Sequence, residues 1–140
     1  METLRKIAYF SMEIALDPEI PTYAGGLGAL AGDTLRAGAD LKLPMCAVTL
    51  LHRKGYFRQR LDDSGWQFEE EDPWDIENYL TPMEPRVTLT LDDRQVWIRC
   101  WRYEIEGQMG DDIPVYLLDT DVEGNSEWDR HLADRLYLGD

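Results

Sequence analysis

The chain has 140 residues, of which 44% are hydrophobic and 11% aromatic, and this content is enough for one domain with a hydrophobic core. It carries 28 acidic residues against 14 basic ones, for a formal net charge of -14, so nucleic acid and anionic membranes are excluded as general partners. Two cysteines lie in apolar runs, and neither a signal peptide nor a long apolar span is present, which predicts a cytoplasmic protein.

An apolar run near the start predicts a buried parallel strand over residues 5–13. Glu13 stands at its carboxyl end, which is where open α/β sheets place their ligands. The Glu13 carboxylate either accepts hydrogen bonds from the loop that follows or contacts a substrate. The residues alone leave both interpretations open.

A glycine cluster at residues 25–28 directly precedes a helix, which we predict over residues 28–40 from apolar residues at helical spacing: Leu27, Leu30, Ala31, Leu35 and Ala39. Glycine leaves no side chain between the backbone and a ligand, and the first amides of a helix are unpaired and attract anions. This pattern predicts a cradle for phosphate or sugar oxygens at Gly25–Gly28, and a simple tight turn is the alternative. The spacing also imitates a dinucleotide-binding fingerprint, but the acid expected about twenty residues further on is missing.

A second apolar run at residues 45–51 completes a strand-helix-strand unit and therefore predicts a parallel sheet. A basic cluster at residues 52–60 follows it and includes His52 and Arg53. These cations either neutralise a phosphate or pair with nearby carboxylates, and the residues taken alone favour pairing. Residues 61–85 are rich in acids and are predicted to be a solvated segment that is mostly loop. Its aromatic residues Trp66, Trp74 and Tyr79 either stack on sugar faces or pack in the core, and the residues taken alone favour packing.

The second half of the chain predicts an antiparallel hairpin over residues 86–105 and a third buried parallel strand over residues 113–119. In the hairpin, Trp97, Trp101, Tyr103 and Ile105 share one face, which predicts contact with the core. A final helix is predicted over residues 127–138, capped by Asn125 or Ser126. The fold class expected is therefore α/β, a Rossmann-like parallel sheet with an antiparallel hairpin excursion.

Several chemistries find no support in the sequence. The histidines and cysteines lack metal-ligand spacing, so no metal site is predicted. No serine-nucleophile elbow and no phosphate-binding Walker sequence is present. Carboxylate pairs for glycoside hydrolysis cannot be singled out among so many acids.

Three segments, residues 7–13, 23–33 and 47–57, together resemble the amino-terminal region of the α-glucan phosphorylases, and they are most similar to the shorter prokaryotic branch. The resemblance runs in order along nearly the whole chain. It implies that residues 1–140 are the amino-terminal portion of the first Rossmann-like domain of a GT-B glycosyltransferase. It also implies phosphorolysis, in which inorganic phosphate cleaves the terminal α-1,4 link of a glucan and releases α-D-glucose 1-phosphate.

The resemblance assigns roles to individual residues of this chain. Gly25, Gly26, Leu27 and Gly28 match the loop that contacts phosphate and the glucosyl unit, and Glu13 matches a catalytic-site acid in the same pocket. Asp33, His52 and Arg53 are expected to support this site. His52 stands where many relatives have tyrosine, so this chain departs from the family pattern at that contact.

The resemblance also implies pyridoxal phosphate as cofactor, but its lysine lies in a carboxyl-terminal domain that these 140 residues do not contain. We therefore expect a fragment that is inactive alone, with glucan and phosphate or glucose 1-phosphate as the partners of the whole enzyme. A truncated sheet would expose apolar surface, so we hypothesise a homo-oligomer. The alternatives are the amino-terminal domain of a glycogen or starch synthase, which usually has lysine where Tyr23 stands, and a stand-alone carbohydrate-binding or regulatory domain.

Overall fold

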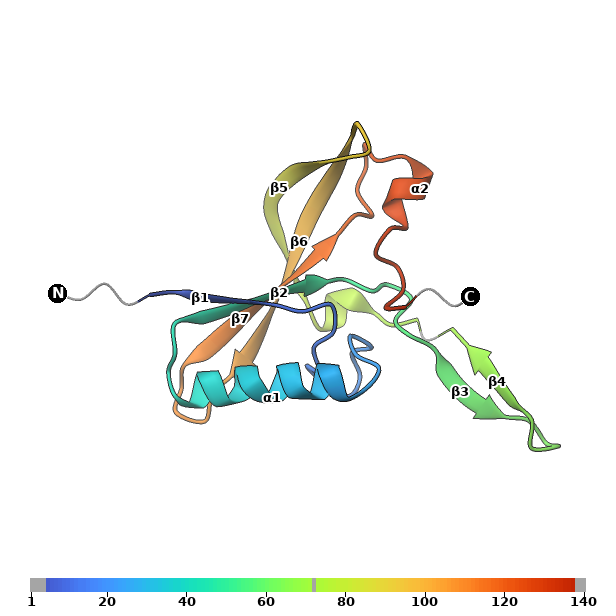
Figure 1. The fold of residues 1–140 in the computed structure, drawn as a ribbon, viewed down its shortest axis with the longest axis horizontal. Coiled ribbons are helices and arrows are strands. Elements are labelled where there is room, and N and C mark those ends of the chain that lie inside the picture. Colours follow the sequence, from blue (N-terminus) through green and yellow to red (C-terminus); the bar gives the residue numbers. More distant parts are fainter. Residues whose placement is uncertain (1–4, 72, 138–140) are drawn as a thin grey trace.

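The computed structural model describes residues 5–71 and 73–137 (Figure 1). The long helix follows the first strand, and the longest strands, β5 and β6, lie in the second half of the chain. In chain order the elements are β1 (Ile7–Phe10), α1 (Gly26–Asp40), β2 (Met45–Leu50), β3 (Arg58–Leu61), β4 (Gln67–Glu70), the 3-10 helix η1 (Ile76–Asn78), β5 (Thr81–Leu91), β6 (Arg94–Glu106), β7 (Asp112–Asp119) and α2 (Glu127–Arg130).

Five strands form one mixed sheet in the order β1-β2-β7-β6-β5. β1, β2 and β7 are parallel, with Ala8 opposite Cys46 and Val48 opposite Tyr116. β6 runs antiparallel to β7, and β5 antiparallel to β6. The predicted α/β class, the three parallel strands and the later hairpin are confirmed. The hairpin is, however, a full part of the main sheet.

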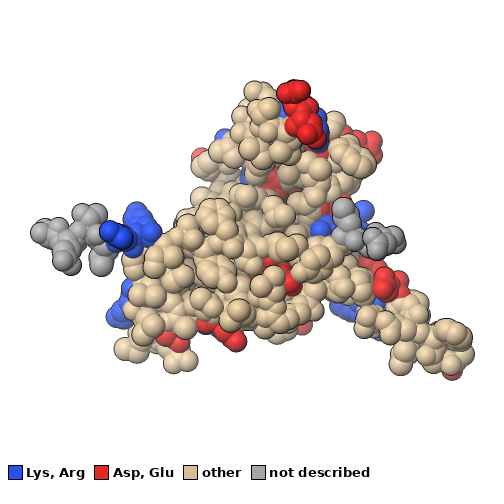
Figure 2. Space-filling model, viewed as in Figure 1, with Lys and Arg blue, Asp and Glu red and all other residues tan. Residues whose placement is uncertain are grey.

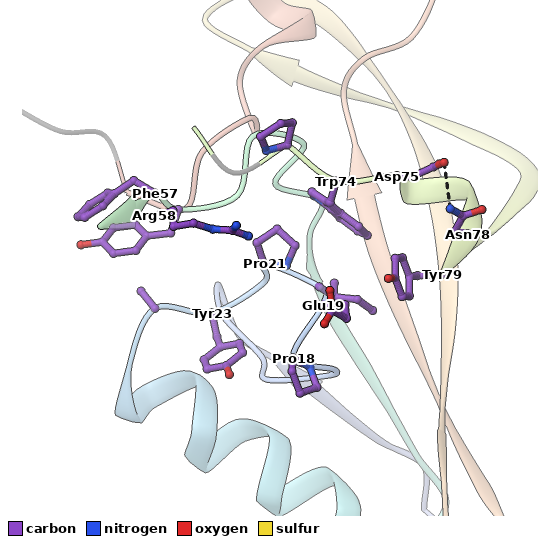
Figure 3. Close-up of a pocket in the computed structure, with 14 residues that line it drawn as sticks. Pro18, Glu19, Pro21, Tyr23, Phe57, Arg58, Trp74, Asp75, Asn78 and Tyr79 are labelled. Carbon is purple, nitrogen blue, oxygen red and sulfur yellow. Dashed lines mark hydrogen bonds between the residues drawn. The ribbon is translucent and has the colours of Figure 1, made fainter. Parts of the chain in front are cut away.

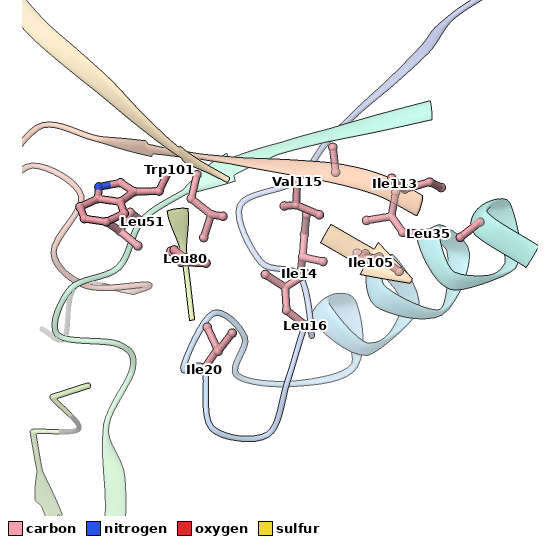
Figure 4. Packing of buried hydrophobic residues seen from close by; sticks show 14 of the residues in the cluster. Ile14, Leu16, Ile20, Leu35, Leu51, Leu80, Trp101, Ile105, Ile113 and Val115 are labelled. Carbon is pink, nitrogen blue, oxygen red and sulfur yellow. The ribbon is translucent and has the colours of Figure 1, made fainter. Parts of the chain in front are cut away.

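Helix α1 packs on one face of this sheet (Figures 1 and 4). Its buried residues recur every three or four positions, which places one side of the helix against β2, β7 and β6. Leu35 belongs to the core cluster together with Ile113 and Val115. Leu27 and Leu30 are exposed, so the prediction that they belong to the apolar face of the helix is wrong. Glycines and alanines allow the close approach of helix to sheet, and the core therefore contacts the side on which these small residues lie.

The opposite face of the sheet is apolar and is not covered by other described residues at its β1 end. Phe10, Val48, Leu50 and Leu118 line a shallow hollow there, and the Phe10 side chain is 74% exposed. The first strand is thus an exposed edge strand, and the prediction that it is buried is wrong. Strand burial depends on the neighbours that cover each face, which the apolar run itself cannot specify.

Two further predictions need correction. The acidic segment predicted as loop contains β4 and η1 and the start of β5, and β3 and β4 form a separate two-stranded hairpin that projects from the body (Figure 1). The last helix is only the four residues of α2, with Trp128 largely exposed. Its predicted cap is confirmed, because the Ser126 hydroxyl accepts a hydrogen bond from the Asp129 amide. The predicted end of that helix at residue 138 lies outside the described residues.

Acidic side chains are scattered over the face shown in Figure 2, and one group lies at the tip of the β5–β6 hairpin. That tip contains Asp92 and Asp93, which both have positive φ angles of 46° and 62°. Short polar side chains tolerate this left-handed conformation in a two-residue turn. Asp92 and Asp93 therefore form the turn between β5 and β6.

Candidate functional site

The candidate site begins where α1 starts. Gly25 is the residue before the first helical turn, its backbone is extended, and no side chain caps the helix. Among the described residues, the backbone amides of Gly26, Leu27 and Gly28 donate no hydrogen bond within the protein. Unpaired amides at a helix amino terminus point along the axis and favour negatively charged or partly negative oxygens. The predicted cradle residues therefore do lie together, with their donors available.

The glycines of this region differ in how much space a side chain would find at each position. A Cβ at Gly28 would overlap the Cβ of Tyr23, and one at Gly32 would overlap the Ala15 carbonyl oxygen, so packing against the protein itself requires glycine at both positions. A Cβ at Gly25 or Gly26 would meet no atom within 4 Å. Neither of these two residues needs a positive φ angle. Intramolecular packing therefore explains Gly28 and leaves Gly25 and Gly26 facing open space.

Glu13 holds the loop in place. Its side chain is 3% exposed, and Oε2 accepts a 2.8 Å hydrogen bond from the amide of Ala24, the residue before the glycine pair. Oε1 accepts a 2.7 Å hydrogen bond from the hydroxyl of Tyr137. This hydrogen bond, followed by burial and the charge of Glu13, raises the pKa of the Tyr137 phenol above its ordinary value. The structural interpretation of Glu13 therefore has direct contacts that support it.

His52 is buried and contacts the backbone next to Glu13. Nε2 lies 3.0 Å from the carbonyl oxygen of Met12, the residue before Glu13, and Nδ1 lies 3.0 Å from the carbonyl oxygen of Ala133. The imidazole thus links the end of the first strand to the carboxyl-terminal segment. It supports the backbone on which Glu13 stands, and its two ring nitrogens are occupied by main-chain atoms.

The side chains of Arg53 and Asp33 contact residues outside the glycine loop. The Arg53 guanidinium makes two hydrogen bonds to the buried carboxylate of Asp119, of 3.1 and 2.6 Å. Burial lowers the pKa of Arg53, but the hydrogen bonds and charge of Asp119 outweigh it and raise that pKa. The interpretation that this cation pairs with a carboxylate is confirmed. Asp33 is exposed, and its carboxylate lies 3.8 Å from the guanidinium of Arg36 on the same helix.

The structure adds residues that the sequence did not single out. Tyr137 lies far from Glu13 in the sequence, and no motif links the two. Tyr23, Tyr56 and Phe57 belong to the segments that carry the resemblance, but only the fold brings them beside Trp74 and Tyr79 around one hollow (Figure 3). In the sequence, the aromatic residues of the acidic segment, Trp74 and Tyr79, were the one signal that pointed to this hollow.

No group of histidine, cysteine, aspartate and glutamate side chains within the described ranges is arranged to hold a metal ion. Among the same residues, no helix is long and apolar enough to cross a membrane.

Comparison with known proteins identifies several relatives, although no protein-family model matches the chain. The chain is 41% identical to a glycogen phosphorylase of Mycobacterium tuberculosis, over 96% of its own length and 16% of that protein. It is 36% identical to a maltodextrin phosphorylase of Thermococcus litoralis, over 94% of its length and 16% of that protein. It is 34% identical to a glycogen phosphorylase of Aquifex aeolicus, over 99% of its length and 20% of that protein. The chain thus spans a fifth or less of the length of these three relatives.

Proposed function

Because the chain belongs to the α-glucan phosphorylase family, we propose that it forms the amino-terminal part of the first Rossmann-like domain of a GT-B glycosyltransferase. In the whole enzyme, inorganic phosphate cleaves the terminal α-1,4 link of a glucan and gives α-D-glucose 1-phosphate. The contribution of this chain is the glycine loop, which holds phosphate and the glucosyl unit. The 140 residues alone do not complete the reaction.

One observation carries this proposal: the amides of residues 26–28 are unpaired beside a glycine pair that faces open space. Phosphorolysis brings an anionic phosphate next to a glucosyl unit that gains positive charge in the transition state. Backbone amides stabilise phosphate oxygens without a mobile charge, and they are already oriented by the helix. A side chain at Gly25 or Gly26 would occupy the space through which those oxygens approach.

In this proposal Glu13 lines the same pocket and also positions the loop. Its hydrogen bond from Ala24 fixes the backbone one residue before the glycine pair. A carboxylate held near 3 Å from a main-chain amide determines where the following amides point. His52 supports this arrangement through the Met12 carbonyl. Asp33 and Arg53 act at most indirectly, because their contacts are with Arg36 and Asp119.

Pyridoxal phosphate is the family cofactor that the relatives imply, and the described residues do not fit its aldehyde. Lys54 forms a 3.7 Å ion pair with Asp134, and Lys6 and Lys42 are exposed. A Schiff-base lysine needs an enclosed site that lowers its pKa, which none of these positions provides. We therefore propose that the cofactor binds to a part of the whole enzyme outside these 140 residues.

A titration of the 15N-labelled chain with glucose 1-phosphate tests the proposal. We expect the amide resonances of residues 26–28 to shift, and we expect Gly26→Ala to abolish those shifts although its fold is intact. Thr34→Ala, on the exposed side of the same helix, is the control and should titrate like the wild type. Shifts that avoid residues 25–28, or a Gly26→Ala variant that titrates normally, would contradict the proposal.

A further inference from the structure

Two arginines of the β5–β6 hairpin differ from the other arginines of the chain. Most arginines of the described residues form an ion pair with a carboxylate, as Arg94 does with Asp129. Arg86 and Arg99 form no ion pair with any described residue, although the chain has 28 acidic residues against 14 basic ones. Their positive charges are therefore not neutralised within the part of the chain that the structure describes.

The strand register places these two arginines together. Arg86 on β5 lies directly opposite Arg99 on β6. Opposed residues of an antiparallel pair project to the same face of the sheet, with their Cβ atoms about 4.5–5.5 Å apart. Two arginine side chains at this spacing can both reach one small group placed between them. Like charges in this position repel each other, and an anion between them would remove that repulsion.

Arg99 is held in place by a buried tryptophan. Its guanidinium lies 4.6 Å from the centroid of the Trp101 ring, and Trp101 is 3% exposed. Trp101 Nε1 is fixed in turn by a 2.9 Å hydrogen bond to Asp119 Oδ2. The Nε atom of Arg99 is buried and has no hydrogen-bond acceptor among the described residues. A buried donor without an acceptor costs free energy, and a ligand oxygen that accepts from this guanidinium would remove the cost.

Asp119 is the acidic residue that lies opposite Arg99 on β7. Its carboxylate is already paired with Arg53 at 2.6 Å and accepts the hydrogen bond from Trp101. Asp119 therefore does not neutralise Arg99. Because Arg53 compensates its negative charge, Asp119 also does little to repel an anion that approaches Arg99.

Two adjacent guanidinium groups match a doubly charged ligand. A phosphoryl group carries a charge of about −1.5 to −2 at neutral pH and has three acceptor oxygens. Such a group can neutralise both arginines at once, because each planar guanidinium donates two parallel hydrogen bonds. A carboxylate has one charge and two oxygens, so it satisfies only one of the two arginines. The ligand class indicated is therefore a phosphoryl group.

We propose that Arg86 and Arg99 together bind one phosphoryl group, either as inorganic phosphate or as part of a phosphomonoester. Figure 1 shows the β5–β6 hairpin rising on the side of the sheet away from α1. This site is independent of the proposed function, because the glycine loop at the start of α1 contributes no residue to it.

The test is a titration of the 15N-labelled chain with inorganic phosphate at constant ionic strength. We expect shifts of the Arg99 Nε–H group, of the Trp101 indole and of the backbone amides of Val87 and Ile98, which are paired next to the two arginines. The same titration with acetate should leave these resonances unchanged. A parallel titration with glycerol 1-phosphate separates the two sources: tighter binding than inorganic phosphate identifies a phosphomonoester, and weaker binding identifies the free ion.

Three variants measure the contribution of the arginines through the Trp101 indole. Arg99→Ala should weaken phosphate binding by about tenfold, because it removes one set of charge-assisted hydrogen bonds. Arg86→Lys keeps the charge without the planar donor pair and should weaken binding by about threefold. Arg102→Ala is the matched control, because it removes an equal charge from the same strand but from an arginine that pairs with Glu104. We expect it to bind phosphate like the wild type.

Gly26→Ala separates this site from the glycine loop, and its hairpin should respond to phosphate like that of the wild type. A variant of this kind that loses the hairpin response would overturn the separate site. A hairpin that does not respond to phosphate, or that responds equally to acetate, would also overturn it. Unchanged binding by both Arg86→Ala and Arg99→Ala would do the same. Circular dichroism checks that each variant is folded, and the exposed Arg86 decides the question if Arg99→Ala is not. A missing response at residues 26–28 alone would count against the proposed function only.

Discussion

Tyr137 and Glu13 lie 124 residues apart in the chain, and the tyrosine hydroxyl donates a 2.7 Å hydrogen bond to the glutamate carboxylate. The other oxygen of that carboxylate holds the Ala24 amide. The carboxyl-terminal segment is thereby connected through one side chain to the backbone that leads into the glycine loop. The hydrogen bond of Tyr137 to Glu13, although Tyr137 is distant in sequence, thus contributes to the position of the amides at the amino terminus of α1.

We predict that Tyr137→Phe lowers the melting temperature and that the difference from the wild type depends on pH. The folded-state pKa of Tyr137 is raised above the unfolded value of about 10. The stabilisation is therefore complete below about pH 10 and is lost as the pH rises through the folded-state pKa. Thermal unfolding from pH 8 to pH 11 measures this, with Tyr9→Phe as control. A constant difference across that range would contradict the prediction.

A pair of glycine variants separates packing from ligand space. Gly28→Ala should destabilise the chain by about 1–3 kcal/mol, because the new methyl group overlaps Tyr23. Gly26→Ala should be neutral or stabilise it by about 0.4–1 kcal/mol, because the methyl group meets nothing and restricts the unfolded chain. Urea unfolding measures both free energies. Equal effects of the two variants would show that the space around these glycines differs from that described.

We predict that Arg53→Ala destabilises the chain by about 2–4 kcal/mol, because it leaves the Asp119 carboxylate buried without its cation. Trp101 Nε1 and the Asp121 amide still donate to Asp119, which keeps the loss below that of a fully orphaned charge. Arg130→Ala is the matched control, because its ion pair with Asp121 is more exposed and should be worth about 0–1 kcal/mol. Urea unfolding compares the two, and similar losses would contradict the ranking.

We predict that the isolated chain self-associates through the open face of the sheet. Phe10 and Leu50 expose apolar surface there beside Val48 and Leu118. Apolar surface of this kind favours association, and a charge on it opposes association. Phe10→Glu should therefore shift the chain toward monomer in sedimentation velocity across a concentration series. Leu41→Glu, on an exposed residue just after α1, should not. A wild-type chain that stays monomeric throughout would exclude this surface as an interface.

The local elements were largely predictable because they depend on neighbours in the sequence. The apolar runs predicted β2 and β7, the alternation predicted the β5–β6 hairpin, and Ser126 predicted the start of α2. The length of α2 was not predictable. Trp128 and Leu132 fit a helical stripe, yet both are exposed. The helix ends at Arg130 because no buried apolar face stabilises further turns.

The glycine loop could be proposed as a site from the sequence, but the packing around each of its glycines could not be predicted. The motif indicates available amides at the start of a helix, which is a property of the backbone alone. Which glycine makes room for Tyr23 and which faces open space depends on the path of the chain between β1 and α1. The hollow lined by Tyr23, Phe57 and Trp74 (Figure 3) is likewise formed by segments that lie dozens of residues apart in the chain, and no local sequence pattern predicts that they meet.

By itself, the sequence determined the acidic character, the α/β class, the family and the place of the glycine turn, because composition, periodicity and a contiguous motif are properties of the chain. The tertiary structure alone decided that Glu13 bonds Tyr137 and Ala24, that Arg53 pairs with Asp119, and that one sheet face stays open. Those outcomes depend on which distant groups meet when the chain packs. The position of a charged side chain in the packed chain then decides whether it pairs with another residue or stays available to a ligand.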